Sequence, residues 1–259
     1  AEFLKRGENM SVFVTGDCHG EWNKLHFYSD KFNEDDFVIV CGDFGIWHDV
    51  NGEGSELDEL SELGVIVCFC DGNHENFDRL YSDEFEVVDF HGGKAHKIRE
   101  NIYHLMRGNV FEFDGKKFFV FGGASSHDIE DGILDPDTFA CEEDFRKEYT
   151  SWWKSGKRFR VKGYSWWEQE LPSEEEMAYG KQCLAEHNNE VDFVISHCAP
   201  QEVASVYSHG GYKSDRLTAY LNEIAMNTKF TSWYMGHYHQ DRRIMSKFNI
   251  LYHRIERIV

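Results

Sequence analysis

Basic residues are scarce for a chain of this length. The 259 residues include 27 Lys and Arg against 47 Asp and Glu, which gives a formal net charge of −20. A protein that binds long nucleic acid through its phosphates needs a basic stripe, and this charge balance argues against one. The balance still allows a local basic pocket for a small anionic substrate, and acidic side chains gathered around metal ions.

Long apolar runs are absent as well. No stretch approaches the ~20 residues that a helix needs to span a bilayer, and the N-terminus lacks the regions of a secretory signal. We therefore expect a cytoplasmic protein without a membrane partner. The first nine residues match no pattern that follows them, so we expect a leader over 1–9 and a single domain over 10–259.

The seven cysteines include no C-x-x-C pair, and their number is odd. Most of them lie within apolar runs, which is typical of buried, reduced thiols in a reducing compartment. Cys18 and Cys198 each neighbour a histidine of interest, but we expect neither of them to be a nucleophile.

Short apolar runs recur along the chain, and each is followed by glycine or serine and then by polar residues. Such runs are typical of strands buried on both faces, and helix-like stretches between them indicate an α/β fold. Asp114-Gly115 between two apolar runs predicts a β-hairpin over 109–121, so we expect a mixed sheet. The strand-bearing segments are 11–20, 36–45, 64–76, 117–128, 192–200 and 232–241, and the helix-like stretches are 21–32, 54–63, 76–82, 173–189 and 214–228.

Residues 140–172 form an irregular block with four tryptophans and a local excess of basic residues. We expect this block to be an insertion or long loop packed on the domain. We interpret its tryptophans as a small core and its basic residues over 154–162 as a solvated face. Stacking on a nucleobase and contact with substrate phosphates are the alternatives.

Polar residues with metal-binding chemistry follow the predicted strands. Carboxylates, imidazoles and an amide oxygen suit Mn²⁺, Fe, Co²⁺, Ni²⁺ or Zn²⁺, and seven ligands are enough for two ions that share a carboxylate. In extended backbone, His237 and His239 would point to the same face. Taken singly, each residue also fits a capping or turn role. The candidate ligands are Asp17, His19, Asp43, Asn73, His197, His237 and His239.

The blocks GDCHG (16–20), GD (42–43), GNHE (72–75), SHCAP (196–200) and GHYH (236–239) occur in an order that resembles the calcineurin-like metallophosphoesterase superfamily. The resemblance implies a four-layer αββα sandwich, with two mixed sheets flanked by helices. It also implies one ion held by Asp17, His19, Asp43 and His239, and another held by Asp43, Asn73, His197 and His237.

The same resemblance implies two divalent transition-metal ions, Mn²⁺ favoured, and attack on phosphorus by a hydroxide held between them. His74 would contact the phosphate or protonate the leaving oxygen. His127 and Arg242 are weaker candidates for substrate contact.

The protein Ser/Thr phosphatases of this superfamily carry an Asp and two arginines that are missing here. Ile46 and Trp47 stand at two of these positions, and Asp71 stands just before the third block. This departure favours a small or nucleotide-like phosphodiester or phosphomonoester substrate. A phosphoprotein phosphatase and a non-catalytic scaffold on the same fold are the alternatives, and the oligomeric state stays open.

Overall fold

Two mixed sheets face each other in the computed structural model, which describes residues 10–47 and 50–259. The expected leader, residues 1–9, lies outside the described residues. The seven-stranded sheet has the order β15 (Ile255–Arg257), β1 (Val12–Thr15), β2 (Phe37–Cys41), β3 (Ile66–Cys70), β6 (Ile102–Leu105), β5 (Gly93–Arg99) and β4 (Glu86–Phe90). The six-stranded sheet has the order β13 (Arg242–Ile244), β14 (Phe248–Ile250), β12 (Ser232–Met235), β11 (Phe193–Ser196), β8 (Lys116–Phe121) and β7 (Val110–Phe113).

Successive side chains along each buried strand pack alternately into two different hydrophobic cores. Val12 and Val14 on β1 belong to the core between the two sheets, whereas Phe13 belongs to the core beneath the helices. This alternation follows from the two-residue period of a strand. Both faces of each central strand are therefore buried, as their near-continuous apolar sequences predict.

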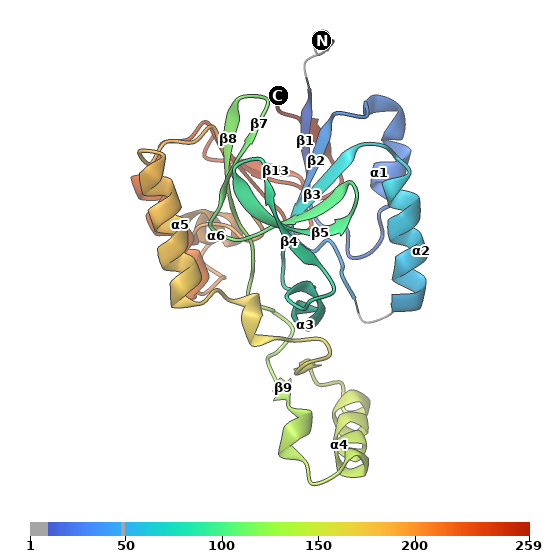
Figure 1. Cartoon of the computed structure of the whole chain (residues 1–259). Coiled ribbons are helices and arrows are strands. Elements are labelled where there is room, and N and C mark those ends of the chain that lie inside the picture. Colours follow the sequence, from blue (N-terminus) through green and yellow to red (C-terminus); the bar gives the residue numbers. More distant parts are fainter. Residues whose placement is uncertain (1–9, 48–49) are drawn as a thin grey trace.

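Helices cover the outer face of each sheet (Figure 1). Leu25 of α1 (Asn23–Phe27) and Leu57 of α2 (Val50–Ser61) pack on the seven-stranded sheet. Leu184 of α5 (Glu174–Glu186), Val203 of α6 (Gln201–Ser208) and Leu221 of α7 (Arg216–Asn227) pack on the six-stranded sheet. The predicted αββα sandwich with two mixed sheets is confirmed. A short helix, α3 (Phe77–Leu80), and a 3₁₀ turn, η1 (Ser29–Lys31), complete the connections of the first half.

Parallel pairing brings the carboxyl ends of several strands to the same edge of each sheet. Strands β1, β2 and β3 run parallel in one sheet, and β8, β11 and β12 run parallel in the other. Since polar residues follow these strands in sequence, the pairing gathers them in space.

The predicted hairpin joins β7 and β8, which pair antiparallel. Asp114 and Gly115 between them both have positive φ, at 47° and 69°. A two-residue turn of this kind matches the twist of the flanking strands, which is why an Asp-Gly pair serves here.

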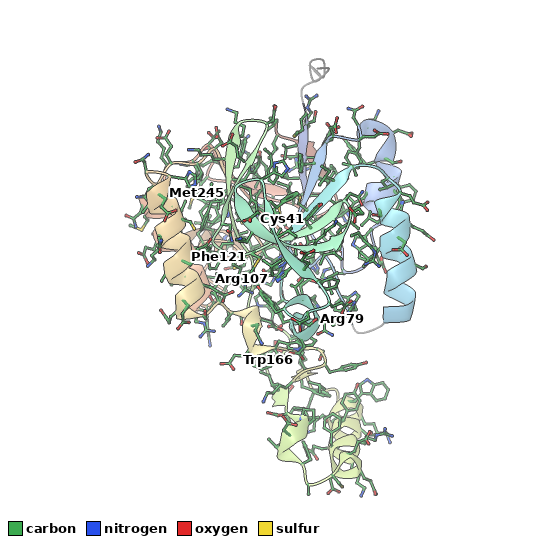
Figure 2. All side chains as sticks on the ribbon, viewed as in Figure 1. Cys41, Arg79, Arg107, Phe121, Trp166 and Met245 are labelled. Carbon is green, nitrogen blue, oxygen red and sulfur yellow. The ribbon has the colours of Figure 1, made fainter. Side chains whose placement is uncertain are left out.

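Residues 128–166 form a projection that we call the lobe, and Figure 1 shows α4 and β9 extending away from the sheets. The lobe contains β9 (Gly132–Leu134), the 3₁₀ turn η2 (Pro136–Thr138), α4 (Glu142–Lys154) and β10 (Phe159–Val161), which pairs parallel with β9. Trp166 lies where the lobe meets the body (Figure 2), and η3 (Glu168–Glu170) leads back to α5.

The stretch expected to be irregular thus contains a helix of 13 residues. Helix α4 buries no residue, but its first turn is acidic and Glu142 pairs with Arg146 one turn later. Acidic residues at a helix N-terminus and i,i+4 ion pairs each stabilise a helix slightly. Phe145, Tyr149 and Trp152 recur at helical spacing along α4 and pack on Phe139 and Phe159. The periodicity typical of a helix is therefore present in this segment, and the expectation of irregular structure was wrong.

Within the described residues, every helix is too short or too polar to cross a bilayer.

Candidate metal centre

Each candidate ligand lies in the loop that follows a central strand. Asp17 and Asp43 come two residues after β1 and β2, and Asn73 comes three residues after β3. His197 directly follows β11, and the GHYH segment follows β12. The ends of both sheets therefore contribute to one centre, and these loops join them there.

Asp17 and Asp43 are buried carboxylates that are held in the same way. Asp17 Oδ1 accepts a hydrogen bond of 2.8 Å from the amide of His237, and Asp43 Oδ1 accepts one of 2.8 Å from the amide of His74. In each case the second oxygen, Oδ2, remains directed toward the histidine side chains. The two oxygens of each carboxylate thus have separate roles, one anchored to the backbone and one facing the centre.

Two motif glycines make this anchoring possible. A Cβ at Gly236 would lie 2.1 Å from Asp17 Oδ1, and a Cβ at Gly72 would lie 2.0 Å from Asp43 Oδ1. Any larger residue would push the carboxylate off its amide, which explains glycine in the third and fifth sequence blocks.

Four residues form a compact donor cluster that we call the first group: Asp17, His19, Asp43 and His239. One possible ligand atom from each lies within 4.8 Å of the others. His239 Nε2 is 3.1 Å from Asp17 Oδ2 and 3.0 Å from His19 Nε2. Asp17 Oδ2 is buried, and no donor in the described part of the chain reaches it in hydrogen-bond geometry, since His239 approaches as an ion-pair partner only. A buried carboxylate oxygen in this condition fits a cation.

The second group consists of Asn73, His197 and His237 beside the shared Asp43. His197 Nε2 lies 3.2 Å from Asp43 Oδ2 and 3.3 Å from Asn73 Oδ1. Burial alone would raise the pKa of the Asp43 carboxyl, but His197 outweighs burial and holds that pKa well below its usual value. Asp43 faces both groups, because His19 Nδ1 lies 3.8 Å from the same oxygen.

His197 is oriented like a metal-binding histidine. Its Nδ1 donates to the carbonyl oxygen of Cys41 at 2.8 Å, which leaves Nε2 directed at the oxygens of Asp43 and Asn73. Imidazoles that bind metals usually donate their other N–H to a carbonyl or carboxylate in this way. The donor set, the orphaned Asp17 oxygen and this orientation together fit divalent metal ions.

The GHYH segment does not continue the strand as extended backbone. Strand β12 ends at Met235, and φ is +69° at His237 and +49° at His239. Left-handed backbone costs a non-glycine residue roughly 1–3 kcal/mol, and such strain gathers at functional sites. The expectation that both imidazoles share one strand face was therefore wrong. His239 turns toward Asp17 and His19, whereas His237 turns toward His197 and His127.

The same left-handed geometry occurs in His19 and Asp43, with φ of 53° and 47°. Three members of the first group, including His239, are thus strained. Period-based reasoning assigns strand or helix and has no signal for single left-handed residues.

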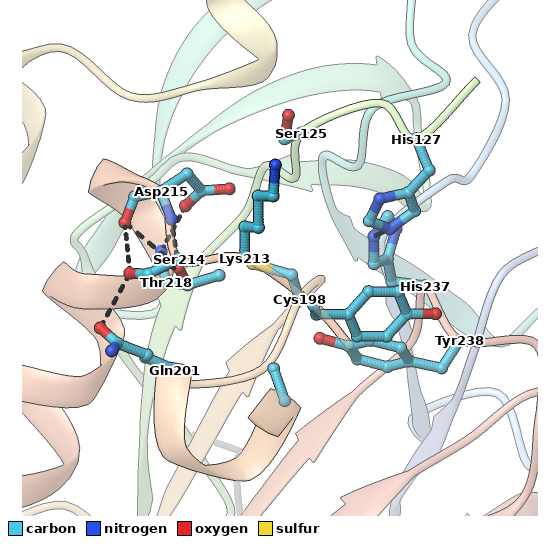
Figure 3. A pocket seen from close by; sticks show the side chains of 12 residues that line it. Ser125, His127, Cys198, Gln201, Lys213, Ser214, Asp215, Thr218, His237 and Tyr238 are labelled. Atoms are coloured by element: carbon cyan, nitrogen blue, oxygen red, sulfur yellow. Dashed lines mark hydrogen bonds between the residues drawn. The ribbon is translucent and has the colours of Figure 1, made fainter. Parts of the chain in front are cut away.

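His127 is exposed, and its Nε2 lies 2.6 Å from Nε2 of His237. Figure 3 shows the two rings against each other, close to Tyr238. One nitrogen must donate to the other, so Nε2 of His237 is engaged with His127, which is not among the candidate ligands. A cavity of about 30 Å³ adjoins them, which suffices for one or two waters and not for a substrate.

Arg242 lies exposed on β13, and its guanidinium is 5.7 Å from the centre of the Tyr207 ring. Tyr207 packs on Tyr238, the residue between the two motif histidines, at 4.8 Å. Arg242 is thus linked to the GHYH segment by the packing of Tyr207 on Tyr238. Substrate contact by Arg242 stays a prediction.

His74 contacts a residue that sequence reasoning assigned to the solvent. Its Nε2 lies 2.9 Å from Nη2 of Arg160, which is only 7% exposed. The interpretation of residues 154–162 as a solvated face was wrong for Arg160, although Lys154, Lys157, Arg158 and Lys162 are exposed. Burial lowers the pKa of His74 to about 4, with Arg160 adding to this effect and Asp43 opposing it.

The residue before the third block, Asp71, faces a buried partner. Arg107 Nε lies 3.0 Å from Asp71 Oδ2, and His104 Nε2 lies 3.2 Å from Asp71 Oδ1. Asp71 therefore anchors the end of β3 to Arg107 and the end of β6. Nothing in the local sequence around Asp71 signals a partner 36 positions away.

Glu75, the last residue of GNHE, braces the loop that carries Asp43. Its carboxylate accepts hydrogen bonds from the amides of Phe44, Gly45 and Ile46. This positioning role was missed, because a glutamate after a ligand gives no sequence signal of its own.

The cysteines behave as expected. Five of the seven are buried, and all of them are free. Burial raises the pKa of the Cys18 thiol to about 11, and burial also raises that of Cys198. The expectation that most cysteines are buried is confirmed. Buried thiols with raised pKa are poor nucleophiles, in line with the prediction for Cys18 and Cys198.

Fold and site together define an α/β sandwich with a candidate metal centre at the carboxyl ends of its strands. The sequence profile of the calcineurin-like phosphoesterases matches residues 10–241, which include all seven candidate ligands. The chain belongs to the calcineurin-like phosphoesterase family, whose members are generally metal-dependent hydrolases. A comparison with curated proteins gave no match.

Proposed function

We propose that this protein is a metal-dependent hydrolase of phosphate esters, acting on small or nucleotide-like phosphodiesters or phosphomonoesters. The observation that carries the proposal is the first group, in which a buried carboxylate oxygen without a hydrogen-bond donor faces two imidazoles and a second carboxylate. Family membership supports the reaction class.

Two divalent transition-metal ions, with Mn²⁺ favoured, would supply a water activated for attack and would neutralise charge on the phosphoryl group. The first group would hold one ion. Asp43 and the second group, Asn73, His197 and His237, would hold the other. The chain's own contribution is to fix these donors through the amides that hold Asp17 and Asp43 and through the carbonyl that orients His197.

A cleft of about 740 Å³ beside the centre supports a small substrate. Such a volume is typical of pockets for small molecules. Ser125 lines this cleft and also the small cavity at His127 and His237, so the two spaces adjoin. Trp166, Ile129 and Ile133 give the cleft apolar walls. Its charged lining is mixed: Lys162, which pairs with Asp135, and Arg216 lie with Glu168 and Glu170. An ester with a flat or apolar leaving group would suit this lining.

His74 is proposed to act at the phosphoryl group. We also propose that residues 10–259 form one domain with an insertion at about 140–172, and that the protein works in the cytoplasm.

The test is metal analysis combined with a panel of phosphate esters. Purified protein is stripped with a chelator, reloaded with Mn²⁺, Zn²⁺, Co²⁺, Ni²⁺ or Fe²⁺, and assayed on aryl phosphomonoesters, bis-aryl phosphodiesters, nucleotides and phosphopeptides. We expect metal-dependent turnover of the small esters. Turnover confined to phosphopeptides would favour the phosphatase alternative. Metal binding that raises Tm without hydrolysis anywhere in the panel would favour the scaffold.

A further inference from the structure

Arg160 is a lobe residue that enters the metal centre. It lies on β10, and its side chain is 7% exposed. Its guanidinium is held from several directions by the body and the lobe. Nε donates to Asp128 Oδ1 at 2.6 Å, Nη1 donates to the carbonyl oxygens of Ser165 at 3.1 Å and Asn73 at 3.5 Å, and Nη2 donates to His74 at 2.9 Å.

Burying a guanidinium is costly unless its charge is compensated and its donors are satisfied. The compensation here is incomplete. Asp128 is half exposed, and Glu170 approaches only to 3.7 Å. One of the two Nη2 hydrogens has no acceptor in the described part of the chain. A buried guanidinium with incomplete compensation indicates that Arg160 has a functional role.

The contact with His74 has a defined direction. A guanidinium can only donate, so Nε2 of His74 accepts and carries no hydrogen of its own. The amide of His74 donates to Asp43, and the His74 ring lies 5.0 Å from the ring of His19. Arg160 therefore contacts Asn73 directly through its carbonyl oxygen and reaches the other residues of the centre through His74.

We propose that Arg160 binds a phosphoryl oxygen of the ester at this centre, and that His74 and Asp128 hold its guanidinium in place for this contact. The inference rests on the proposed function. The Nη2 hydrogen that has no acceptor is the donor open to a phosphoryl oxygen. A charged donor fixed before substrate arrives stabilises developing charge without reorganisation. In this arrangement His74 acts at the phosphoryl group through Arg160, which it positions, and the lobe supplies a substrate-binding residue to the body.

The experiment compares Arg160→Met and Arg160→Lys with Arg158→Met in the full chain loaded with Mn²⁺. Arg158 is the matched control, because it lies two residues away on the lobe, is 60% exposed and pairs with Glu130. The readouts are kcat and KM on an aryl phosphate ester, the Kd of inorganic phosphate by calorimetry, bound Mn²⁺ per chain, and Tm.

We expect Arg160→Met to lower kcat/KM by about 100-fold, as loss of one fixed donor does in other sites. The Kd of phosphate should rise at least about tenfold, with Mn²⁺ content unchanged. Arg160→Lys should recover part of the phosphate affinity, since lysine keeps the positive charge but lacks the planar, rigid guanidinium. In a further variant, Arg160→Ala, guanidinium ion at low millimolar concentration should restore part of the activity. Arg158→Met should match the unaltered protein.

Unchanged kcat/KM and phosphate affinity in Arg160→Met would overturn the proposal. So would a loss of Mn²⁺ that accounts for the whole effect, because Arg160 would then serve only to hold Asn73 and His74. If Arg160→Met does not fold, Asp128→Ala replaces it and should raise the Kd of phosphate about threefold, as loss of one orienting hydrogen bond would; no change would count against the proposal. If the unaltered protein hydrolyses no ester, the proposed function fails, while the phosphate affinities still decide the role of Arg160.

Discussion

The two groups of the candidate centre differ in how far the protein assembles them without an ion. In the first group, four donors from three loops already lie within 4.8 Å of one another. In the second group, His197 contacts both Asp43 and Asn73, but His237 is engaged with His127. The first group also has two carboxylates, whereas the second shares one of them and otherwise has one amide oxygen and two imidazoles. We therefore expect the ions to load in order, the first group before the second.

Loss of the shared carboxylate should have the largest effect, because it removes the feature that the two groups have in common. Asp43→Asn keeps the size of the side chain but removes the charge that faces both His19 and His197. We expect hydrolysis to fall by on the order of 10³-fold or more, and bound metal to fall at both positions. Assays of an aryl phosphate ester and elemental analysis measure the two quantities. Asp58→Asn, at an exposed ion pair with Arg99, is the control, and equal activity of the two variants would contradict the assignment.

Separate removal of the two motif histidines tests whether the groups are distinct. His239→Ala should lower the affinity of the first group for its ion, and His237→Ala that of the second group. Each affinity should fall by at least roughly 10–100-fold, because losing even a residue that only orients a ligand has that effect. Calorimetric titration of the stripped protein with Mn²⁺ resolves the two events. If both variants lose the same event, the division into two groups is wrong.

His127 engages Nε2 of His237, one of the two ring nitrogens through which His237 could bind an ion. His127→Ala should therefore strengthen binding of the second ion by about fivefold, the equivalent of one hydrogen bond of ~1 kcal/mol. Binding of the first ion should not change. If His127 also contacts substrate, as the sequence predicts, KM should rise in the same variant. Weaker binding of the second ion would show instead that His127 supports the site.

The smallest effect concerns Glu170, which braces the second group through Ser126. Glu170 Oε2 accepts from Ser126 Oγ at 2.7 Å, and Ser126 in turn contacts Asn73. Burial raises the pKa of Glu170 from 4.5 to about 8, with Ser126 and Arg160 opposing it. A raised carboxyl pKa means that the folded protein favours the protonated form. Its contribution to stability is complete below about pH 4.5 and is lost as pH rises through about 8.

Glu170→Gln keeps the neutral form at every pH. We expect its Tm to equal that of the unaltered protein at pH 4.5 and to exceed it by roughly 3 °C at pH 8.5, as about 1 kcal/mol produces in a chain of this size. Thermal melts of the metal-free proteins across this range measure the difference. Parallel curves would mean that Glu170 is ionised throughout.

Much of the fold follows from the sequence. The six predicted strand-bearing segments contain β1, β2, β3, β8, β11 and β12, and the hairpin forms at Asp114-Gly115 as predicted. These predictions hold because buried strands and tight turns leave a local record in apolar runs and turn residues. Helix α4 carries the same kind of signal in Phe145, Tyr149 and Trp152, which share one face, but the Trp-rich and basic composition of the segment pointed to a loop instead.

The candidate site was predictable as a list of residues and not as a geometry. The ordered blocks indicate which side chains carry metal chemistry, and the structure gathers four of them into one donor cluster. The left-handed backbone at His237 and His239, and hence their divergent directions, has no counterpart in strand or helix periodicity. The roles of the individual ligands stay predictions until metal is measured.

By itself, the sequence determined which segments are buried, where the chain turns and which loops carry carboxylates and imidazoles, because each of these depends on neighbouring residues. The tertiary structure alone decided that His239 and His237 face different partners, that Asp71 pairs with Arg107, and that one arginine of the lobe contacts the centre. Arg160 and His74 are 86 positions apart. Contacts over such separations depend on the whole path of the chain, and no local pattern encodes that path.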